Sequence, residues 1–191
     1  MKTQDSPCKR VIVLDTSAFV AGFDSFSLID EQFTVPKVEE EIRRNSMIKM
    51  RLEAAIESGK LKIKTPTQES AAKAEVSANK VGDSSKLSET DKQLLSLALE
   101  FKDEGFAPKI VTDDYSIQNV ATQMGIEFLS LATLGIKRLL EWVRYCPACY
   151  KEYAADSKFK ECLVCGTELK RKPKRPKNSS GLKKPKQQDK Q

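Results

Sequence analysis

The stretch RVIVLDTSAF, residues 10–19, decides the fold of this chain. Its first five residues form a short run that is rich in β-branched apolar side chains, which is typical of a buried strand. The run ends at an acid, Asp15, and a helix can begin in the residues that follow it. The opening of the chain therefore predicts a strand, an acidic residue at its end and a helix directly after it.

Segments of the two kinds alternate further along the chain. The strand-like segments are a weak one at 33–35 and stronger ones at 61–65, 109–112 and 126–131. The helix-like segments are 36–58, 66–80, 88–104, 116–124 and 134–145, and several of them end at a glycine. Residues 81–88 are rich in Gly and Ser and are expected to form a mobile loop. The alternation predicts a parallel sheet flanked by helices, an α/β fold.

Four cysteines near the C-terminus form two close pairs, Cys146-Pro-Ala-Cys149 and Cys162-Leu-Val-Cys165. Two such pairs separated by 12 residues predict a tetrahedral zinc site in a small ribbon. Gly166 follows the second pair and suits a turn position that needs positive φ. Because all four ligands are cysteines, the zinc is expected to be structural. The alternative is two disulfides or four unrelated thiols.

The composition excludes several kinds of chemistry. The 191 residues include no histidine, so Ser-His-Asp and Cys-His catalysis are excluded. No apolar run approaches the length of a membrane span, and the polar N-terminus does not resemble a signal peptide. Four cysteines in metal-type pairs, with Cys8 left over, fit a reducing cytoplasm.

Charge is distributed unevenly along the chain. Residues 170–191 contain 10 of the 33 Lys/Arg and one of the 27 Asp/Glu, so the net charge of this segment is +9. The overall net charge is +6, so the remainder of the chain has a net charge of −3. The segment is also rich in proline, and we expect a disordered basic tail. Such a tail suits a polyanionic partner, although it can also be merely solubilising.

Acids follow two of the expected strands. Asp15 ends the strand at 10–14, and Asp113 and Asp114 end the strand at 109–112. In an open parallel sheet, ligands bind beyond the carboxyl ends of the strands. An acid at this position can also cap the following helix, but two such positions together favour a binding site.

Two further acids lie on the expected helices. With Val38 and Ile42 on the buried face, Glu41 lies roughly 60° from Val38 at about 100° per residue and borders the core, whereas Glu40 faces solvent. Asp91 shares a helix face with Leu94 and is also placed for a capping box with the residue three positions before it. The alternative for Glu41 is a solvated side chain near a helix start.

Four acids at one end of a sheet cannot all ionise without compensation, because like charges raise each other's pKa. Divalent cations provide that compensation, and oxygen ligands favour Mg²⁺ or Mn²⁺ over zinc. In a chain without histidine, metal-activated water is the most economical hydrolytic chemistry. These residues therefore predict a metal-dependent phosphodiesterase or nuclease.

The same segments resemble the PIN-domain ribonucleases. The matching motifs are VIVLDTSAF at 11–19, VPxVxxEI at 35–42, LSxTD at 87–91 and VTDDY at 111–115. In this order, and with a C-terminal zinc ribbon, they resemble the archaeal endonuclease family that matures the 3′ end of small-subunit ribosomal RNA. The resemblance covers about residues 8–168 and does not include the tail.

The resemblance implies a site and a set of partners. Asp15, Glu41, Asp91 and either Asp113 or Asp114 would hold catalytic Mn²⁺ or Mg²⁺, and the family pattern points to Asp114. Thr16 or Ser17 would assist Asp15. The implied substrate is precursor small-subunit rRNA, within the immature small ribosomal subunit, and the protein would be a cytoplasmic monomer.

The expected domains are a PIN nuclease at 8–142, a zinc ribbon at 143–169 and the basic tail at 170–191. Trp142 would pack on the helix that joins the first two domains. Aromatic residues and lysines of the ribbon would stack on bases and contact phosphates, or the aromatic residues would merely pack the small module. These residues are Tyr145, Tyr150, Tyr153, Phe159, Lys151, Lys158 and Lys160.

Two other functions fit parts of the sequence. A toxin-type PIN ribonuclease would cut other RNA, but such proteins are usually a bare domain without ribbon and tail. A non-catalytic RNA-binding assembly factor would use the ribbon and tail, but degenerate nucleases lose acids and this chain keeps all four positions.

Overall fold

A computed structural model describes residues 8–43, 45–132, 135 and 141–174. Its larger sheet has five parallel strands: β1 (Arg10–Leu14), β2 (Glu31–Thr34), β3 (Leu61–Ile63), β4 (Ala107–Val111) and β5 (Glu127–Leu129). The strand order is β3-β2-β1-β4-β5. Residues 11–14 of the central strand β1 are all buried, as expected for a sheet covered on both faces. The predicted α/β fold is confirmed.

The strand order places a crevice at the end of β1. The chain adds β2 and β3 on one side of β1 and then crosses to add β4 and β5 on the other side. The connections that leave β1 and β4 therefore diverge, which opens a crevice beyond the carboxyl ends of these two strands. The register pairs Leu14 with Val111, so Asp15 and the acids after β4 emerge from adjacent strands.

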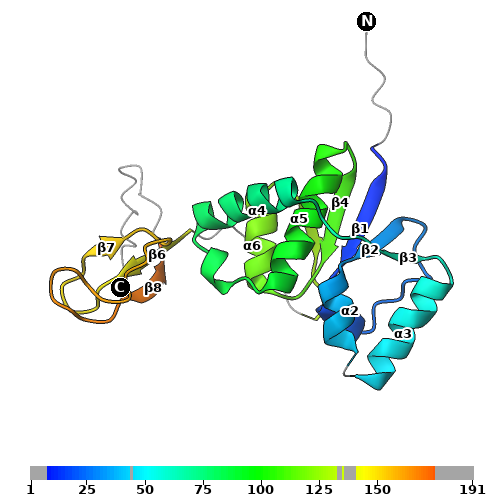
Figure 1. The fold of residues 1–191 in the computed structure, drawn as a ribbon, viewed down its shortest axis with the longest axis horizontal. Coiled ribbons are helices and arrows are strands. Elements are labelled where there is room, and N and C mark those ends of the chain that lie inside the picture. Colours follow the sequence, from blue (N-terminus) through cyan, green and yellow to red (C-terminus); the bar gives the residue numbers. More distant parts are fainter. Residues whose placement is uncertain (1–7, 44, 133–134, 136–140, 175–191) are drawn as a thin grey trace, which may run out of the picture.

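Among the described residues, six α-helices connect the strands of the larger sheet. They are α1 (Thr16–Val20), α2 (Pro36–Ile42), α3 (Ser46–Glu57), α4 (Gln68–Val81), α5 (Glu89–Asp103) and α6 (Tyr115–Gln123), with a short 3₁₀ turn, η1, at Ser84–Lys86. Helix α5 packs on β1 and β4 and also contacts α4 and α6, while α3 packs on α1 and β3 (Figure 1). In the described part of the chain, no helix is long and apolar enough to cross a membrane.

The prediction of one helix over 36–58 is wrong. The chain forms two helices, α2 and α3, and Asn45 caps the second by accepting a hydrogen bond from the backbone N–H of Ile48 at 3.4 Å. An asparagine favours a cap over a helix interior because its side chain competes for backbone hydrogen bonds. The break lets Ile42 of α2 and Leu52 of α3 both reach the core.

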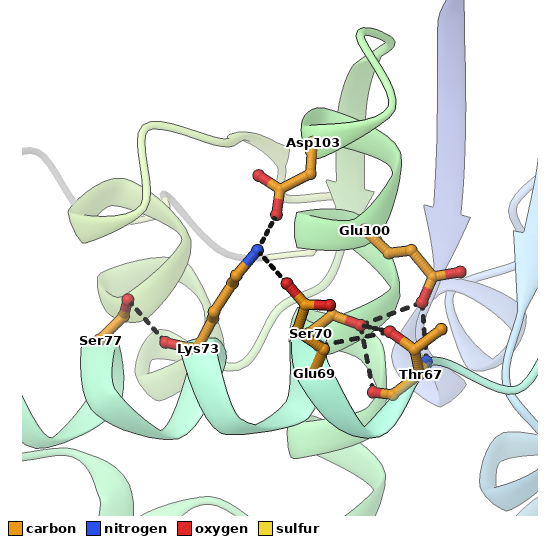
Figure 2. A network of polar contacts seen from close by, with 7 residues as sticks. All are labelled: Thr67, Glu69, Ser70, Lys73, Ser77, Glu100 and Asp103. Carbon is orange, nitrogen blue, oxygen red and sulfur yellow. Dashed lines mark hydrogen bonds and ion pairs between the residues drawn. The ribbon is translucent and has the colours of Figure 1, made fainter.

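Glu100 of α5 anchors the start of α4 (Figure 2). Its Oε2 accepts hydrogen bonds from the backbone N–H of Thr67 at 2.7 Å and from the hydroxyl of Ser70 at 3.0 Å. Its Oε1 lies 2.9 Å from Nζ of Lys64. Burial acts to raise the pKa of Glu100, but these hydrogen bonds outweigh it and lower the pKa to about 2. The long helix α4 is therefore fixed at one end, and its other end points toward the smaller module (Figure 1).

The smaller module is a three-stranded antiparallel sheet at one end of the molecule (Figure 1). Its strands are β6 (Trp142–Tyr145), β7 (Glu152–Tyr153) and β8 (Lys170–Pro173), in the order β7-β6-β8. The predicted helix 134–145 is wrong over its last residues, because 142–145 form β6; residues 133–134 and 136–140 lie outside the described residues. Pairing of β6 with β8, more than 20 residues later, overrides local helical preference.

Strand β8 also changes the expected limits of the modules. Lys170 to Pro173 pair with β6, so the first residues of the predicted disordered tail belong to the ribbon. The ribbon likewise starts at Trp142, one residue before the expected boundary. Residues 175–191, the rest of the predicted tail, lie outside the described residues.

Candidate active site and cysteine cluster

Asp15 is the buried centre of the candidate active site. It follows β1 directly and is 7% exposed. One carboxylate oxygen accepts a hydrogen bond from the backbone N–H of Thr16 at 2.6 Å, and the other accepts from the hydroxyls of Ser17 at 2.7 Å and Thr112 at 2.8 Å. Burial raises the pKa of Asp15, and the hydrogen bonds only partly oppose this. The carboxylate is held rigidly in a position that disfavours its own charge.

Glu41 is held by two threonines from different helices. The hydroxyl of Thr16 donates to Oε2 at 2.6 Å, and the hydroxyl of Thr90 donates to Oε1 at 2.5 Å. Glu41 thereby joins the start of α1 to the start of α5. Glu41 was expected to border the core, but its solvent-exposed area places it among the exposed residues. The two threonines, rather than burial, therefore orient its side chain. Glu40 is exposed, as predicted, and pairs with Lys37 at 2.9 Å.

Asp91 has two roles in the structure. Its Oδ2 accepts a hydrogen bond from the backbone N–H of Ser88 at 2.7 Å, and its own N–H donates to the Ser88 hydroxyl at 3.2 Å, which completes a capping box. Burial, together with the charges of Asp114 and Asp15, raises the pKa of Asp91. Asp91 therefore caps α5, as the alternative interpretation predicted. In this position, Asp91 is also within electrostatic reach of Asp15 and Asp114.

The two acids after β4 point in different directions. Asp113 Oδ1 accepts hydrogen bonds from the Ser130 hydroxyl at 2.5 Å and from the backbone N–H groups of Leu131 and Ala132 at 3.0 Å, so it holds the segment after β5. Asp114 is exposed and caps α6 through one oxygen. The charge of Asp114 is among those that raise the pKa of Asp91, so Asp114 lies within electrostatic reach of that carboxylate.

Sequence reasoning missed the role of Thr90 and Thr112. Thr112 donates to Asp15 and accepts from the backbone N–H of Asp114 at 3.1 Å, so it ties β4 to β1. Thr90 is 5% exposed and orients Glu41. Thr90 directly precedes Asp91, and Thr112 directly precedes the pair Asp113-Asp114; this proximity to acids is the signal that could have identified the two threonines.

The donor set fits a hard divalent cation. Asp15, Glu41, Asp91 and Asp114 offer only oxygen atoms, which suit Mg²⁺ or Mn²⁺. Burial raises the pKa of both Asp15 and Asp91, and neither carboxylate forms a salt bridge with a cation of the described residues. Within the described ranges, the carboxylates are less tightly grouped than the cysteines, whose ligand atoms all lie within 4.8 Å of one another.

The four cysteines of the ribbon form the second candidate site. Cys146, Cys149, Cys162 and Cys165 are not joined by disulfides, so the disulfide alternative is wrong. The Sγ atoms of Cys146 and Cys165 lie 3.4 Å apart, as do those of Cys149 and Cys162. Four thiolates in one compact group fit a tetrahedral zinc ion with no open position. Cys8 is exposed and lies outside this group.

The two cysteine turns share one backbone device. In each turn, the residue after the second cysteine has a positive φ: 72° at Gly166, as predicted, and 62° at Tyr150. Its backbone N–H donates to the carbonyl of the first cysteine in both turns. A tyrosine in this conformation is strained where a glycine is not. The side chain of Tyr150 is 75% exposed, so the strain is not repaid by burial.

The other ribbon aromatics divide into two groups. The hydroxyl of Tyr153 lies 3.1 Å from Sγ of Cys162 and accepts from the backbone N–H of Leu163 at 3.1 Å, so Tyr153 supports the cysteine cluster. The ammonium of Lys172 lies over the ring of Tyr145, 4.8 Å from the ring centre. Phe159 is 49% exposed, like Tyr150 a side chain that a partner can reach.

This fold and site define the class of protein. Residues 12–101 match the family described as the PIN domain of ribonuclease, so this part of the chain is a PIN domain. An endoribonuclease Nob1 from Methanothermobacter thermautotrophicus is 40% identical over 162 residues, which are 84% of this chain and 91% of that protein. Another from Pyrococcus abyssi is 37% identical over 168 residues, 87% of this chain and 96% of that protein. The chain belongs to the Nob1 family of endoribonucleases.

A relative with a different name is also similar. Ribonuclease VapC1 from Thermoplasma acidophilum is 33% identical over 162 residues, which are 84% of this chain and 77% of that protein. Relatives of both names are ribonucleases. The predicted endoribonuclease activity is therefore confirmed as a class, and the prediction of a non-catalytic protein is not supported.

Proposed function

We propose that this protein is a divalent-metal-dependent endoribonuclease that cleaves precursor small-subunit rRNA at its 3′ end while the small ribosomal subunit matures in the cytoplasm. The observation that carries the proposal is the grouping of Asp15, Asp91 and Asp114 near the ends of β1 and β4, with Glu41 tied to the same helix starts. Membership in the Nob1 family supports the choice of RNA as substrate.

In this proposal, Asp15, Glu41, Asp91 and Asp114 would hold Mn²⁺ or Mg²⁺. When bound there, such a cation supplies charge neutralisation, polarisation of the phosphodiester and an activated water. The hydroxyls of Thr16 and Thr90 orient Glu41, and Thr112 orients Asp15. Each carboxylate oxygen has two lone pairs, so it can accept these hydrogen bonds and still face a cation. The chain thus prearranges its ligands before any substrate arrives.

The ribbon would serve this reaction by positioning RNA, with zinc as a structural ion held by its four cysteines. Tyr150 and Phe159 are the exposed aromatic side chains that can stack on unpaired bases, while Lys151, Lys158 and Lys160 are exposed cations for phosphates. We expect the basic tail to add salt-sensitive affinity that does not depend on sequence. The working assumption is that the protein acts as a monomer on the immature subunit.

The test is cleavage of a labelled RNA that spans the 3′ end of small-subunit rRNA, free and within precursor subunits. We expect a discrete cut at the mature end that requires Mn²⁺ or Mg²⁺ and is lost with EDTA. Asp114→Asn is expected to abolish the cut, whereas the neighbouring Asp113→Asn, which changes the same charge, is expected to retain most of it.

Three outcomes would count against the proposal. Cleavage that survives EDTA would refute metal dependence. Equal loss in the Asp113→Asn and Asp114→Asn variants would refute the assignment of Asp114. Efficient cutting of transfer or messenger RNA, with none at the rRNA 3′ end, would favour a toxin-type ribonuclease. The similarity to ribonuclease VapC1 is the reason for including these RNAs in the test.

A further inference from the structure

A basic groove lies between the PIN domain and the ribbon. It has a volume of about 460 Å³ and is bordered by the η1 turn on one side and by β6, β8 and the ribbon loops on the other. The charged residues that line it are Lys86, Arg144, Lys160, Lys170, Arg171 and Glu168. Five cations therefore surround one acid. We call this feature the inter-module groove.

Most of this positive charge is uncompensated. Lys86, Lys160 and Lys170 are exposed, and none of them forms an ion pair with an acid of the described chain. Arg144 donates a hydrogen bond to the carbonyl of Phe159 at 2.8 Å, which leaves its charge in place. Several like charges around one hollow repel each other and raise the local concentration of anions. A polyanion is the partner that this arrangement favours.

The walls of the groove are fixed by a buried ion pair. Asp83, two residues after the end of α4, is 2% exposed and pairs with Arg171 of β8. Arg171 also donates to the carbonyl of Gly82 at 2.7 Å. Asn119 of α6 donates to the second oxygen of Asp83 at 2.5 Å. The guanidinium of Arg171 stacks 4.3 Å from the ring centre of Trp142. Residues from the PIN domain and from both long strands of the ribbon thus form one contact.

Gly82 allows the two modules to approach closely. A Cβ on this residue would lie 2.9 Å from the carbonyl oxygen of Trp142 and would overlap the side chain of Ala155, and the φ of Gly82 is +74°. No other residue type fits both constraints without displacing the ribbon. The loop at 81–88, expected to be merely mobile, is therefore the surface on which the ribbon docks, and the groove has a defined shape.

One short segment joins the groove to the candidate active site. Lys86 lines the groove, and Asp91, five residues later, belongs to the acid group. Five residues span at most about 18 Å even when fully extended. A strand bound in the groove and a strand at the acids can therefore be parts of one RNA segment of a few nucleotides.

We propose that single-stranded RNA adjoining the cleavage site lies in the inter-module groove, with its phosphates against Lys86, Arg144, Lys160 and Lys170. This inference rests on the proposed function for the identity of the polyanion. The four side chains are positioning residues: they hold the strand so that the phosphodiester to be cut reaches the acids. The buried pair of Asp83 and Arg171 keeps the two walls of the groove in register.

The test removes the groove charges and compares the result with an equal change elsewhere. The variant carries Lys86→Gln, Lys160→Gln and Lys170→Gln. The control carries Lys49→Gln, Lys60→Gln and Lys109→Gln, three lysines that do not line the groove. Affinity for labelled single-stranded RNA is measured by fluorescence anisotropy in EDTA over a series of salt concentrations, and KM and kcat are then measured with Mn²⁺.

We expect the groove variant to bind RNA at least tenfold more weakly than the control. Three lost phosphate contacts should also lower the slope of log affinity against log salt by about 2, because a single strand contributes roughly 0.7 per contact. KM should rise while kcat at saturating RNA stays within about twofold. Equal affinities and equal slopes for the two triple variants would overturn the inference.

The readouts keep the two proposals apart. If the wild type cuts RNA and both triple variants bind and cut alike, the groove inference fails while the proposed function stands. If the wild type cuts no RNA but the groove variant alone binds weakly, the proposed function fails while the groove remains an RNA site. A lowered kcat with unchanged KM would also count against the groove, since it would indicate damage to the acid group rather than loss of binding.

Discussion

The PIN domain and the ribbon are stabilised in different ways. The PIN domain has an apolar core that runs from Val11 to Ile126, whereas the buried side chains of the described ribbon, residues 141–174, are Cys146 and Cys162. Burial of apolar area stabilises the PIN domain, whereas the ribbon has almost no apolar area to bury. Because of this difference in buried apolar area, we expect the PIN domain to fold by itself. We expect the ribbon to depend on its cysteine cluster and on its contact with the PIN domain.

The largest expected effect is the loss of the zinc ion that we propose for the cysteine cluster of the ribbon. Strong chelation, or Cys162→Ser, should unfold the ribbon and leave the PIN domain folded, because structural zinc contributes on the order of 10 kcal/mol in small modules. Trp142, the one tryptophan of the chain, reports on the ribbon by fluorescence, and far-ultraviolet circular dichroism reports mainly on the helices. Cys8→Ser, outside the cluster, is the matched control. Simultaneous loss of both signals would show that the modules fold as one unit.

The next effect concerns the acids of the PIN domain. Asp15→Asn should lower the cleavage rate by about 10²–10³-fold, since a bound cation supplies several kcal/mol of transition-state stabilisation. The same change should leave the melting temperature unchanged or raise it, because burial raises the pKa of Asp15 and its ionised form opposes folding. Asp30→Asn, at the opposite end of the sheet, should change neither quantity. A parallel loss of activity and stability would indicate a structural role for Asp15.

The contact between the two regions is the third test. Arg171→Ala leaves Asp83 buried without its cation and should cost about 3 kcal/mol in the stability of the docked state. Because Arg171 stacks on Trp142, the tryptophan fluorescence should change together with resistance to proteolysis near residue 82. Lys172→Ala, the neighbouring residue paired with exposed Glu152, should have little effect. Equal effects of the two substitutions would remove the special role of Arg171.

A smaller effect is expected at Glu100, within the PIN domain alone. Its pKa in the folded protein, about 2, lies below the ordinary value of 4.5, so it adds stability above about pH 4.5 that is lost as the pH falls toward 2. Glu100→Gln should therefore lower the free energy of unfolding by about 2 kcal/mol at pH 7, and the difference from wild type should shrink between pH 4.5 and 3. A difference that does not vary with pH would contradict this account. Ser77→Ala on α4 is the control.

The smallest effect concerns the strained turn of the ribbon. Tyr150→Gly should stabilise the ribbon by about 1 kcal/mol and slow its loss of zinc, because glycine adopts positive φ without strain. Tyr150→Ala keeps most of the strain and serves as the control. If the exposed ring stacks on RNA, both variants should bind RNA equally weakly. Unchanged RNA affinity in both would show that the ring is not a contact.

Much of the fold could be predicted because its signals are local. The β-branched run at 10–14, the periodic helix at 88–104 and the two cysteine pairs each occupy a short window of sequence, and each forms the predicted feature. The break at Asn45 was missed because a polar residue inside a helical pattern can either cap a new helix or continue the existing one. The packing of Ile42 and Leu52 in the core decides between these two conformations.

The candidate site was predicted in part. The order of acids after strands pointed to Asp15 and to the pair Asp113 and Asp114, since parallel strands end at one edge. The orientation of Glu41 was not predictable from helix periodicity, because Thr16 and Thr90 come from two other segments. Strand β6 was mistaken for a helix because its partner β8 is remote in the sequence.

By itself, the sequence determined the strands, the acids at their ends and the cysteine ligands, because each depends on neighbouring residues and on backbone periodicity. Only the tertiary structure decided which threonines orient Glu41 and Asp15 and how the ribbon docks. Asp83 and Arg171 are 88 residues apart, and nothing local to either one specifies the other. Their contact exists because α4, α6, β6 and β8 bring them to one place, where Arg171 and Asn119 compensate the buried carboxylate of Asp83.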